Sequence, residues 1–180
     1  DESGLAVSLF DVEDMDAPSL IERVYFGAKW GWMVEDQDRI HKAFGIYPEQ
    51  ELIVMPFAGW SPGETGYWYG SYHSGVQLID WTDDTLVERG VAKHHGAARR
   101  ALLHGDELLV LSDERIEAFD ITDRDAPESL SALRIARIVY EAVVVPAAGL
   151  MAQLSTDWWT QSGRLDLVPI DAPNSSNPVG

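Results

Sequence analysis

The chain has 180 residues, of which 46% are hydrophobic, so it is long enough to fold around a sizeable core. Asp and Glu number 30 against 13 Lys and Arg, and the formal net charge of −17 produces a field that repels nucleic-acid phosphates and anionic membranes. With no cysteine there is no disulfide, thiolate metal site or iron–sulfur cluster, and no apolar run approaches the roughly 20 residues that span a bilayer.

One strand-like phrase recurs along the chain. It consists of an apolar alternation ending in Phe-Asp, an Asp-rich turn and Ala-Pro, and it is most complete at residues 8–18 and 117–127. Less complete copies cover residues 76–84 and 165–173. The aspartates that mark the four copies are separated by 69, 40 and 51 residues: Asp11, Asp80, Asp120 and Asp171. With an aromatic insert between the first two copies discounted, the period is about 40–50 residues, which is typical of a propeller blade.

A second unit lies between these phrases. It is an apolar run, a short Gly, Pro or polar turn, and another apolar run, and in chain order it covers residues 41–56, 100–111 and 140–154. Each unit predicts a β-hairpin, and its continuous apolar runs indicate strands buried on both faces. The repeated phrase supplies a third strand, and residues 86–91 and 130–135 supply a fourth. No stretch shows capped helical periodicity, so the sequence predicts an all-β chain.

These elements predict a β-propeller of about three to four blades. The blades cover residues 5–173, and residues 174–180 are expected to form a tail or linker. The chain opens and closes on a third-strand phrase, which would leave unpaired blade edges. We therefore expect a sector of a larger ring, completed by a further chain or chain segment; a self-contained four-bladed ring is the alternative. The missing initiator methionine indicates a processed chain or a piece of a longer one.

Residues 5–133 also resemble a known family. The phrases that carry the resemblance are Phe10-Asp11-Val12, His41-Lys42-Ala43-Phe44, Gly75-Val76-Gln77-Leu78-Ile79-Asp80 and Arg100-Ala101-Leu102-Leu103-His104-Gly105-Asp106-Glu107-Leu108. In this order they resemble the bacterial and archaeal secreted proteins with a C-terminal β-propeller distantly related to WD repeats. That family usually has Asp directly before His-Lys-Ala-Phe, whereas this chain has Ile40. The resemblance implies a secreted or cell-envelope-associated propeller and supplies no catalytic residues.

Three histidines are candidate metal ligands. His41 and the pair His94 and His95 precede equivalent strands of successive blades, and equivalent loops meet at one rim of a propeller. With Asp38 nearby, such a site would suit a divalent metal such as zinc, copper or iron(II). However, adjacent His94 and His95 point to opposite sides in a strand, and no His pair has ligand spacing. The alternative is that they are ordinary loop histidines.

The Asp-rich turns of the repeated phrase raise the question of calcium, which prefers oxygen ligands. The acidic residues are Asp11, Glu13, Asp14 and Asp16 in the first copy and Asp120, Asp123 and Asp125 in the third. They lack the Gly and terminal Glu of the helix–loop–helix calcium loop. The favoured interpretation is structural, with Asp capping the turn by bonding its own backbone.

The aromatic insert is the candidate ligand- or partner-binding segment. Aromatic side chains among Gly and Ser offer large, rigid contact area, as recognition loops and sugar-stacking platforms do. The residues concerned are Trp60, Tyr67, Trp68, Tyr69 and Tyr72. The alternative is an ordered loop packed on its own rings. Trp30 and Trp32, in contrast, are expected to pack within a blade.

No motif for nucleophilic catalysis or nucleotide binding is present. The sequence thus leaves open whether any reaction is catalysed. It favours a binding or scaffolding module with a protein or carbohydrate ligand. The alternative function is a metal-binding propeller or metalloenzyme that uses a His and carboxylate site at the channel rim.

Overall fold

The computed structural model describes residues 4–34, 39–62, 70–136, 138–157 and 162–173. Within these ranges the chain is built from strands, and the only helical segments are short 3₁₀ turns at Ile40–Lys42, Pro48–Gln50 and Pro146–Ala148. The all-β prediction is confirmed. The predicted tail, residues 174–180, lies outside the described residues.

In chain order the strands are β1 (Leu5–Asp11), β2 (Ser19–Phe26), β3 (Trp30–Trp32), β4 (Gly45–Tyr47), β5 (Leu52–Trp60), β6 (Tyr72–Trp81), β7 (Leu86–Lys93), β8 (Arg100–His104), β9 (Glu107–Leu111), β10 (Arg115–Asp120), β11 (Glu128–Arg134), β12 (Val139–Val145), β13 (Leu150–Asp157) and β14 (Ser162–Pro169).

In the described ranges the strands form four antiparallel sheets. The first sheet is β1–β2, the third is the meander β8–β9–β10–β11, and the fourth is β12–β13–β14. In the second sheet, β5, β6 and β7 follow one another, while β4 and β3 pair with opposite ends of β5. The third sheet shows the full four-stranded unit. The first sheet corresponds to its last two strands, and the fourth to its first three.

The repeated phrase takes the same position in three sheets, at the end of the third strand of the unit. Asp11 ends β1, Asp80 lies in β6 next to its last residue, and Asp120 ends β10. In each case the pairing with the following strand shifts register just before or beside this aspartate. The repeat read from the sequence therefore marks a structural repeat.

The fourth copy is displaced from this position. Ile170 donates its backbone N–H to the Gly149 carbonyl, as Trp81 does to Glu51 and Ile121 to Asp106. Pro169 therefore occupies the place of Asp80 and Asp120. The prediction that Asp171 marks the fourth copy is wrong by two residues, because hydrogen bonding to the preceding hairpin turn, and not the aspartate, sets the strand register.

The predicted hairpins match observed strand pairs with one exception. Pairs β8–β9 and β12–β13 form as expected, and β7 and β11 supply the fourth strands. The sequence predicts a single strand over residues 41–47, but only Gly45–Tyr47 forms one. Lys42 donates its backbone N–H to the Arg39 carbonyl, which closes a turn in place of the first half of the strand. The edge of β5 is therefore covered by two short strands instead of one.

Strands β5 and β6 of the second sheet are buried on both faces, as their continuous apolar runs predict. On one face, Val54 and Leu78 join a cluster with Leu108 of the third sheet. On the other face, Ile79 and Phe57 pack with residues of the first sheet. Alternate residues of β5 and β6 thus enter two different cores. Burial of both faces holds the first three sheets together.

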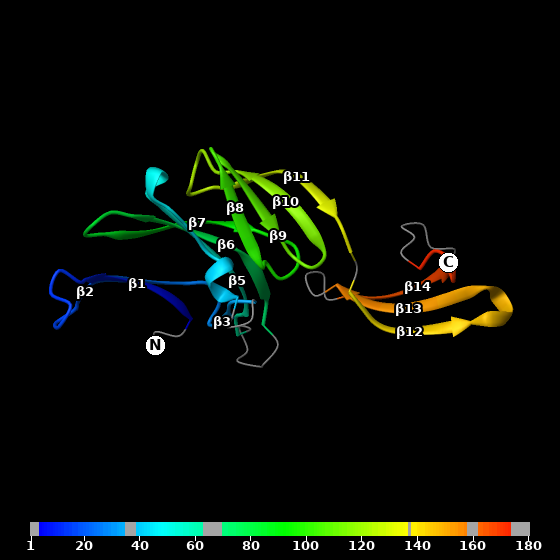
Figure 1. The fold of residues 1–180 in the computed structure, drawn as a ribbon. Helices are drawn as coiled ribbons and strands as arrows, with labels where there is room; N and C mark the ends of the chain where they lie inside the picture. The colour runs from blue at the N-terminus through cyan, green and yellow to red at the C-terminus, as the bar shows by residue number, and fades with distance from the viewer. Residues whose placement is uncertain (1–3, 35–38, 63–69, 137, 158–161, 174–180) are drawn as a thin grey trace.

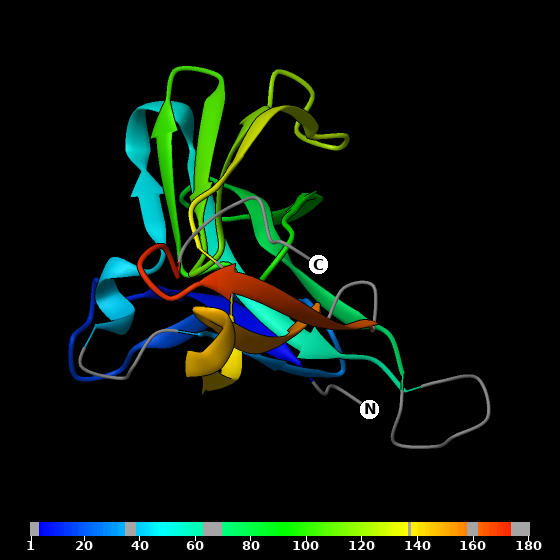
Figure 2. The same cartoon turned by 90° about the vertical axis from the view of Figure 1, so that its right-hand side faces the viewer.

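The fourth sheet lies apart from these cores. In Figure 1 it extends beyond the third sheet towards the C-terminal end, and Figure 2 views it from that side. Its first strand is exposed along its whole length, and large apolar side chains such as Val143 (54%) and Leu165 (64%) face solvent. The sheets form an open array, as a sector of a larger ring would.

Polar contacts also join the second and third sheets. The loop between β10 and β11 places Arg124 so that its guanidinium pairs with Asp80 and donates to the Gln50 carbonyl at 2.9 Å. Gly90 of β7 donates its N–H to the Arg124 carbonyl at 2.8 Å. A Cβ at Gly90 would lie 2.4 Å from the carbonyl oxygen of Asp125, so the approach of the two sheets requires glycine here.

We expect Gly90→Ala to lower the free energy of unfolding by about 1–3 kcal/mol, because the added methyl group forces the β10–β11 loop away from β7. Urea titration measures the loss. Gly163→Ala is the matched control, since a Cβ at Gly163 meets no atom within 4 Å and should change stability little. Equal effects of the two substitutions would contradict the close approach at Gly90.

We expect Glu51→Gly to raise stability by about 0.5 kcal/mol. Glu51 ends the turn before β5 with φ 50° and ψ 42°, and the equivalent turn before β13 has Gly149 in that conformation. Relief of the left-handed conformation outweighs the extra chain entropy of glycine. Thermal unfolding tests this, with Glu49→Gly in the same turn as a control that should destabilise. A loss of stability in Glu51→Gly as large as that in Glu49→Gly would refute it.

Candidate functional site

The end of the β5–β6 hairpin extends past β4 and presents two chemically different faces. Opposite residues on the paired strands include Trp60 with Tyr72, and Gly59 with His73. Because side chains alternate between faces along a strand, the two pairs point to opposite sides of the sheet. One face is aromatic, and the other borders a cavity.

The aromatic face consists of Trp30, Trp32, Trp60 and Tyr72. Trp30 lies opposite Trp60, which in turn lies opposite Tyr72, and the last two rings are 5.2 Å apart between centroids. Trp32 follows on the same side of β3. The side chains of Trp30 and Trp32 are 42% and 40% exposed. This row of rings on neighbouring strands is partly open to solvent.

The hydroxyl of Tyr72 stays protonated at neutral pH. Burial raises the pKa of Tyr72 above its ordinary value, a hydrogen bond with Ser74 acts in the opposite direction, and the negative charge of Glu114 adds to the increase. Glu114 belongs to the turn between β9 and β10, so this end of the aromatic face lies near the third sheet. The face can therefore offer a neutral phenol close to a carboxylate.

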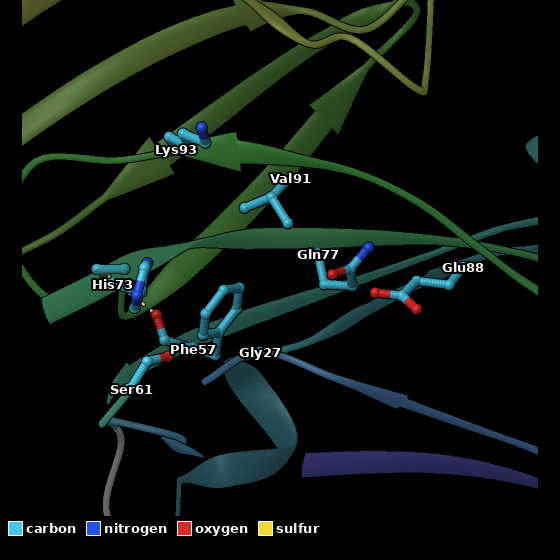
Figure 3. Close-up of a pocket in the computed structure, with 9 residues that line it drawn as sticks. Gly27, Phe57, Ser61, His73, Gln77, Glu88, Val91 and Lys93 are labelled. Carbon is cyan, nitrogen blue, oxygen red and sulfur yellow. Dashed lines mark hydrogen bonds between the residues drawn. The ribbon is translucent and has the colours of Figure 1, made fainter. Parts of the chain in front are cut away.

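The opposite face borders a cavity of about 230 Å³ between the second sheet and the chain leaving β2 (Figure 3). Its apolar surface comes from Phe57 and Val91, and its polar surface includes Gln77. The remaining residues that line it are Gly27, Ser61, His73, Ser74, Glu88 and Lys93. The cavity combines a ring face with both hydrogen-bond donors and acceptors.

Two of the predicted binding residues of the insert, Trp60 and Tyr72, lie on the aromatic face, where their rings contact each other. Their role in binding stays a prediction, and Tyr67, Trp68 and Tyr69 lie outside the described residues. The sequence predicts blade packing for Trp30 and Trp32, and their exposure contradicts this. They lie on β3, which pairs with the far end of β5, beyond the apolar core. Nothing in the sequence of β3 indicates that pairing.

The predicted metal ligands lie in different environments. His41 is exposed in the turn Ile40–Lys42, His94 is completely buried, and His95 is half-buried. In the part of the chain that the structure describes, no group of three or more His, Asp or Glu side chains is arranged to hold a metal ion. Asp38 lies outside that part. The metal site thus remains a prediction from the sequence alone.

His94 has a structural partner that the sequence did not indicate. Its Nδ1 lies 3.2 Å from Glu117 Oε2, across the boundary between the second and third sheets. The other carboxylate oxygen of Glu117 accepts a 2.7 Å hydrogen bond from Ser129. Burial lowers the pKa of His94 to about 4, although the Glu117 carboxylate opposes this change. His94 is therefore a neutral histidine packed between two sheets.

The Asp-rich turns form the backbone contacts expected of structural turns. Asp11 accepts a hydrogen bond from the N–H of Glu13, and Asp120 accepts one from Thr122. A second aspartate in each turn makes the same kind of contact: Asp14 accepts from the N–H of Asp16, and Asp123 accepts from the N–H of Asp125. The two hydrogen bonds with Thr122 also lower the pKa of Asp120. These contacts favour the structural interpretation over calcium binding.

Comparison with known proteins identifies the repeat. A family model described as "Beta propeller domain" matches residues 1–124, more than half of the chain. The chain belongs to this β-propeller family. No curated protein sequence matches it. Among solved structures, a putative 6-phosphogluconolactonase from Bacteroides fragilis is similar over 91% of this chain and 67% of its own, with 9% identity and a TM-score of 0.29.

The sheets are therefore propeller blades, and the open array is a partial propeller. In the described residues the second and third sheets are blades with all of their strand positions filled, whereas the first shows two strands and the fourth three. The aromatic face and the cavity lie on opposite faces of one blade, the second. In the described residues no helix is long and apolar enough to cross a membrane.

The buried His94 makes the propeller sensitive to acid. Below about pH 6.5 the unfolded chain takes up a proton at an ordinary histidine pKa, while folded His94 stays neutral down to about pH 4. We expect its contribution to the free energy of unfolding to be lost as pH falls through this window, by at most about 1.4 kcal/mol per pH unit. Urea titrations at several pH values measure the slope.

His94→Gln should remove this part of the slope. His41→Gln, which changes an exposed histidine, should keep it and serves as the control. If His94→Gln and wild type lose stability in parallel between pH 6.5 and 4, the assignment of acid sensitivity to His94 is wrong.

Proposed function

We propose that this propeller is a binding module, without a catalytic role of its own, that recognises a neutral carbohydrate chain through the aromatic face. The observation that carries the proposal is the pair of tryptophans on one side of β3, Trp30 and Trp32, each about two-fifths exposed (42% and 40%) beside Trp60 and Tyr72. Large side chains of this kind cost free energy when they face water, and a flat ligand that covers the rings recovers it.

The spacing of the rings suits an extended ligand. Alternate residues on a strand are about 7 Å apart, and neighbouring strands are separated by about 4.8 Å. Trp30 and Trp32 are therefore offered as successive stacking surfaces along β3, with Trp60 one strand away. A chain of sugar rings presents flat C–H faces at intervals of similar size. The rings are attached to a hydrogen-bonded sheet, so little order must be gained on binding.

Charge narrows the class of ligand. The net charge of −17 repels polyanions, and the carboxylate of Glu114 lies near the Tyr72 end of the aromatic face. An uncharged glycan avoids this repulsion. The same argument disfavours nucleic acid and acidic polysaccharides as ligands.

We also propose that binding takes place outside the cytoplasm, at the cell envelope or in the medium. Support comes from the resemblance of residues 5–133 to secreted propeller proteins. Fractionation of the source cells tests this. Recovery of the protein only in the cytosolic fraction would contradict it.

Trp30→Ala and Trp32→Ala should each weaken binding to a neutral polysaccharide by about three- to tenfold, because each removes one stacking surface. Affinity electrophoresis in gels that contain cellulose derivatives, xylan, mannan or starch measures the effect. Leu165→Ala is the control, since Leu165 is 64% exposed on the fourth sheet. Trp→Phe at the same positions should retain most of the affinity.

Two results would overturn the proposal. The first is that no neutral polysaccharide slows the migration of wild type. The second is that Trp30→Ala and Leu165→Ala weaken binding equally, which would place the ligand elsewhere on the propeller.

A further inference from the structure

The cavity on the opposite face of the second blade contains a polar atom whose hydrogen-bonding capacity the protein does not use. Gln77 is 1% exposed, and its Oε1 is buried without a donor among the described residues. A buried acceptor left in this state costs about 1–3 kcal/mol. The aromatic face does not account for it, since Gln77 points to the other side of β6.

The orientation of the Gln77 amide is fixed by the protein. Its Nε2 is in hydrogen-bonding range of three backbone carbonyls, those of Leu78, Arg89 and Gly90. The register shift in the β6–β7 pair at this point frees carbonyls from the regular ladder. If the amide were flipped, its oxygen would face these carbonyl oxygens. Oε1 is therefore the amide atom that is left without a protein donor in the described residues, and it lies on the Phe57 side of the amide (Figure 3).

Figure 3 shows how the neighbouring side chains are placed. The Gln77 side chain lies between the Phe57 ring and the Glu88 carboxylate, with its oxygen on the side of Phe57. The Phe57 ring is itself held by an edge contact with Phe26, at 6.0 Å between centroids and 76° between planes. A ring on the cavity wall thus stands beside a buried acceptor.

Gly27 lets the chain leaving β2 pass close to the Phe57 ring, which is 3% exposed. It has φ +79°, and a Cβ there would lie 3.2 Å from the Phe57 ring. The backbone can therefore pass close to the ring without a side chain over it.

The charged groups at the rim of the cavity restrict the charge that a ligand can carry. Glu88 supplies a second acceptor, while Lys93 supplies a cationic donor, and both side chains are exposed. An anion would meet the Glu88 carboxylate and the Gln77 oxygen, and a cation would meet Lys93. Hydroxyl groups both donate and accept, so a neutral polyhydroxylated molecule satisfies all three residues.

The volume of the cavity limits the size of the ligand. The cavity of about 230 Å³ is smaller than the roughly 300–1,000 Å³ of sites for drug-sized ligands. It would take one sugar ring or a short polyol, with the C–H face of the ligand against Phe57. We propose that this cavity binds a neutral monosaccharide or polyol, with a ligand hydroxyl donating to Gln77 Oε1. This second site does not rest on the proposed function of the aromatic face.

Saturation-transfer NMR with D-glucose, D-galactose and sorbitol as probes tests the proposal on the whole chain, with glucuronate as a charged comparison. We expect at least one neutral probe to bind saturably and glucuronate to bind at least tenfold more weakly. Glu88→Ala should weaken binding of the neutral probe about tenfold. This variant should fold normally, because the Glu88 side chain is exposed.

Three further variants distinguish binding in this cavity from binding elsewhere on the propeller. Glu107→Ala, an exposed glutamate on β9, and Trp30→Ala, on the opposite face, should both leave binding unchanged. Gln77→Leu should abolish binding, although it also removes the donor to the β7 carbonyls. No saturable binding of any neutral probe overturns the proposal, as does unchanged affinity in Glu88→Ala. A loss of affinity in Trp30→Ala alone would assign the probe to the aromatic face.

Discussion

Burial of both faces of the β5–β6 ladder is the constraint on which the rest of this molecule depends. Alternate side chains of the two strands enter separate apolar cores, so neither strand has a solvent face along its central part. Such a ladder tolerates polar side chains only where their hydrogen bonds are provided for. Ser74 meets that condition by donating to the Phe57 carbonyl, whereas Gln77 meets it for its Nε2 but not for its Oε1 among the described residues. The aromatic face lies at the end of the hairpin, where the cores stop.

The second and third blades are joined by a polar contact through the β10–β11 loop. The corresponding loop of the first blade makes no such contact among the described residues. Arg124 in the loop after β10 docks on Asp80 and on the Gln50 carbonyl of the preceding blade. The equivalent loop after β1 has the same pair of aspartate turns but has Met15 in place of Arg124, and this side chain is 79% exposed. The same type of loop thus forms an interface in the third blade and is exposed to solvent in the first. The apolar strands of the fourth blade are exposed for the same reason, because no adjoining blade covers them in the part of the chain that the structure describes.

The two candidate binding surfaces follow from a single geometric fact. Where β5 and β6 extend past the inner strand β4, their side chains still alternate, so neighbouring positions serve opposite faces. Trp60 and Tyr72 join the tryptophans of β3 on one face, while the other face borders the cavity beside Phe57 and Gln77. His94, in contrast, is a predicted site residue that the fold buries completely. A histidine that was a reasonable metal ligand in the sequence is enclosed between blades next to Glu117, where burial keeps it neutral.

The sequence alone determined the all-β class, the blade period and most strand positions. These follow from local properties: apolar runs, turn residues, and a phrase whose aspartates bond their own backbone in each copy. It also singled out Trp60 and Tyr72 as candidate binding residues, because aromatic residues in a Gly- and Ser-rich segment are conspicuous. Only the tertiary structure decided that β3 pairs with the far end of β5, that Glu117 faces His94, and that the Gln77 oxygen has no donor among the described residues. Each of these depends on which distant strand lies alongside and in what register, and side-chain alternation converts a shift of one residue into a change of face.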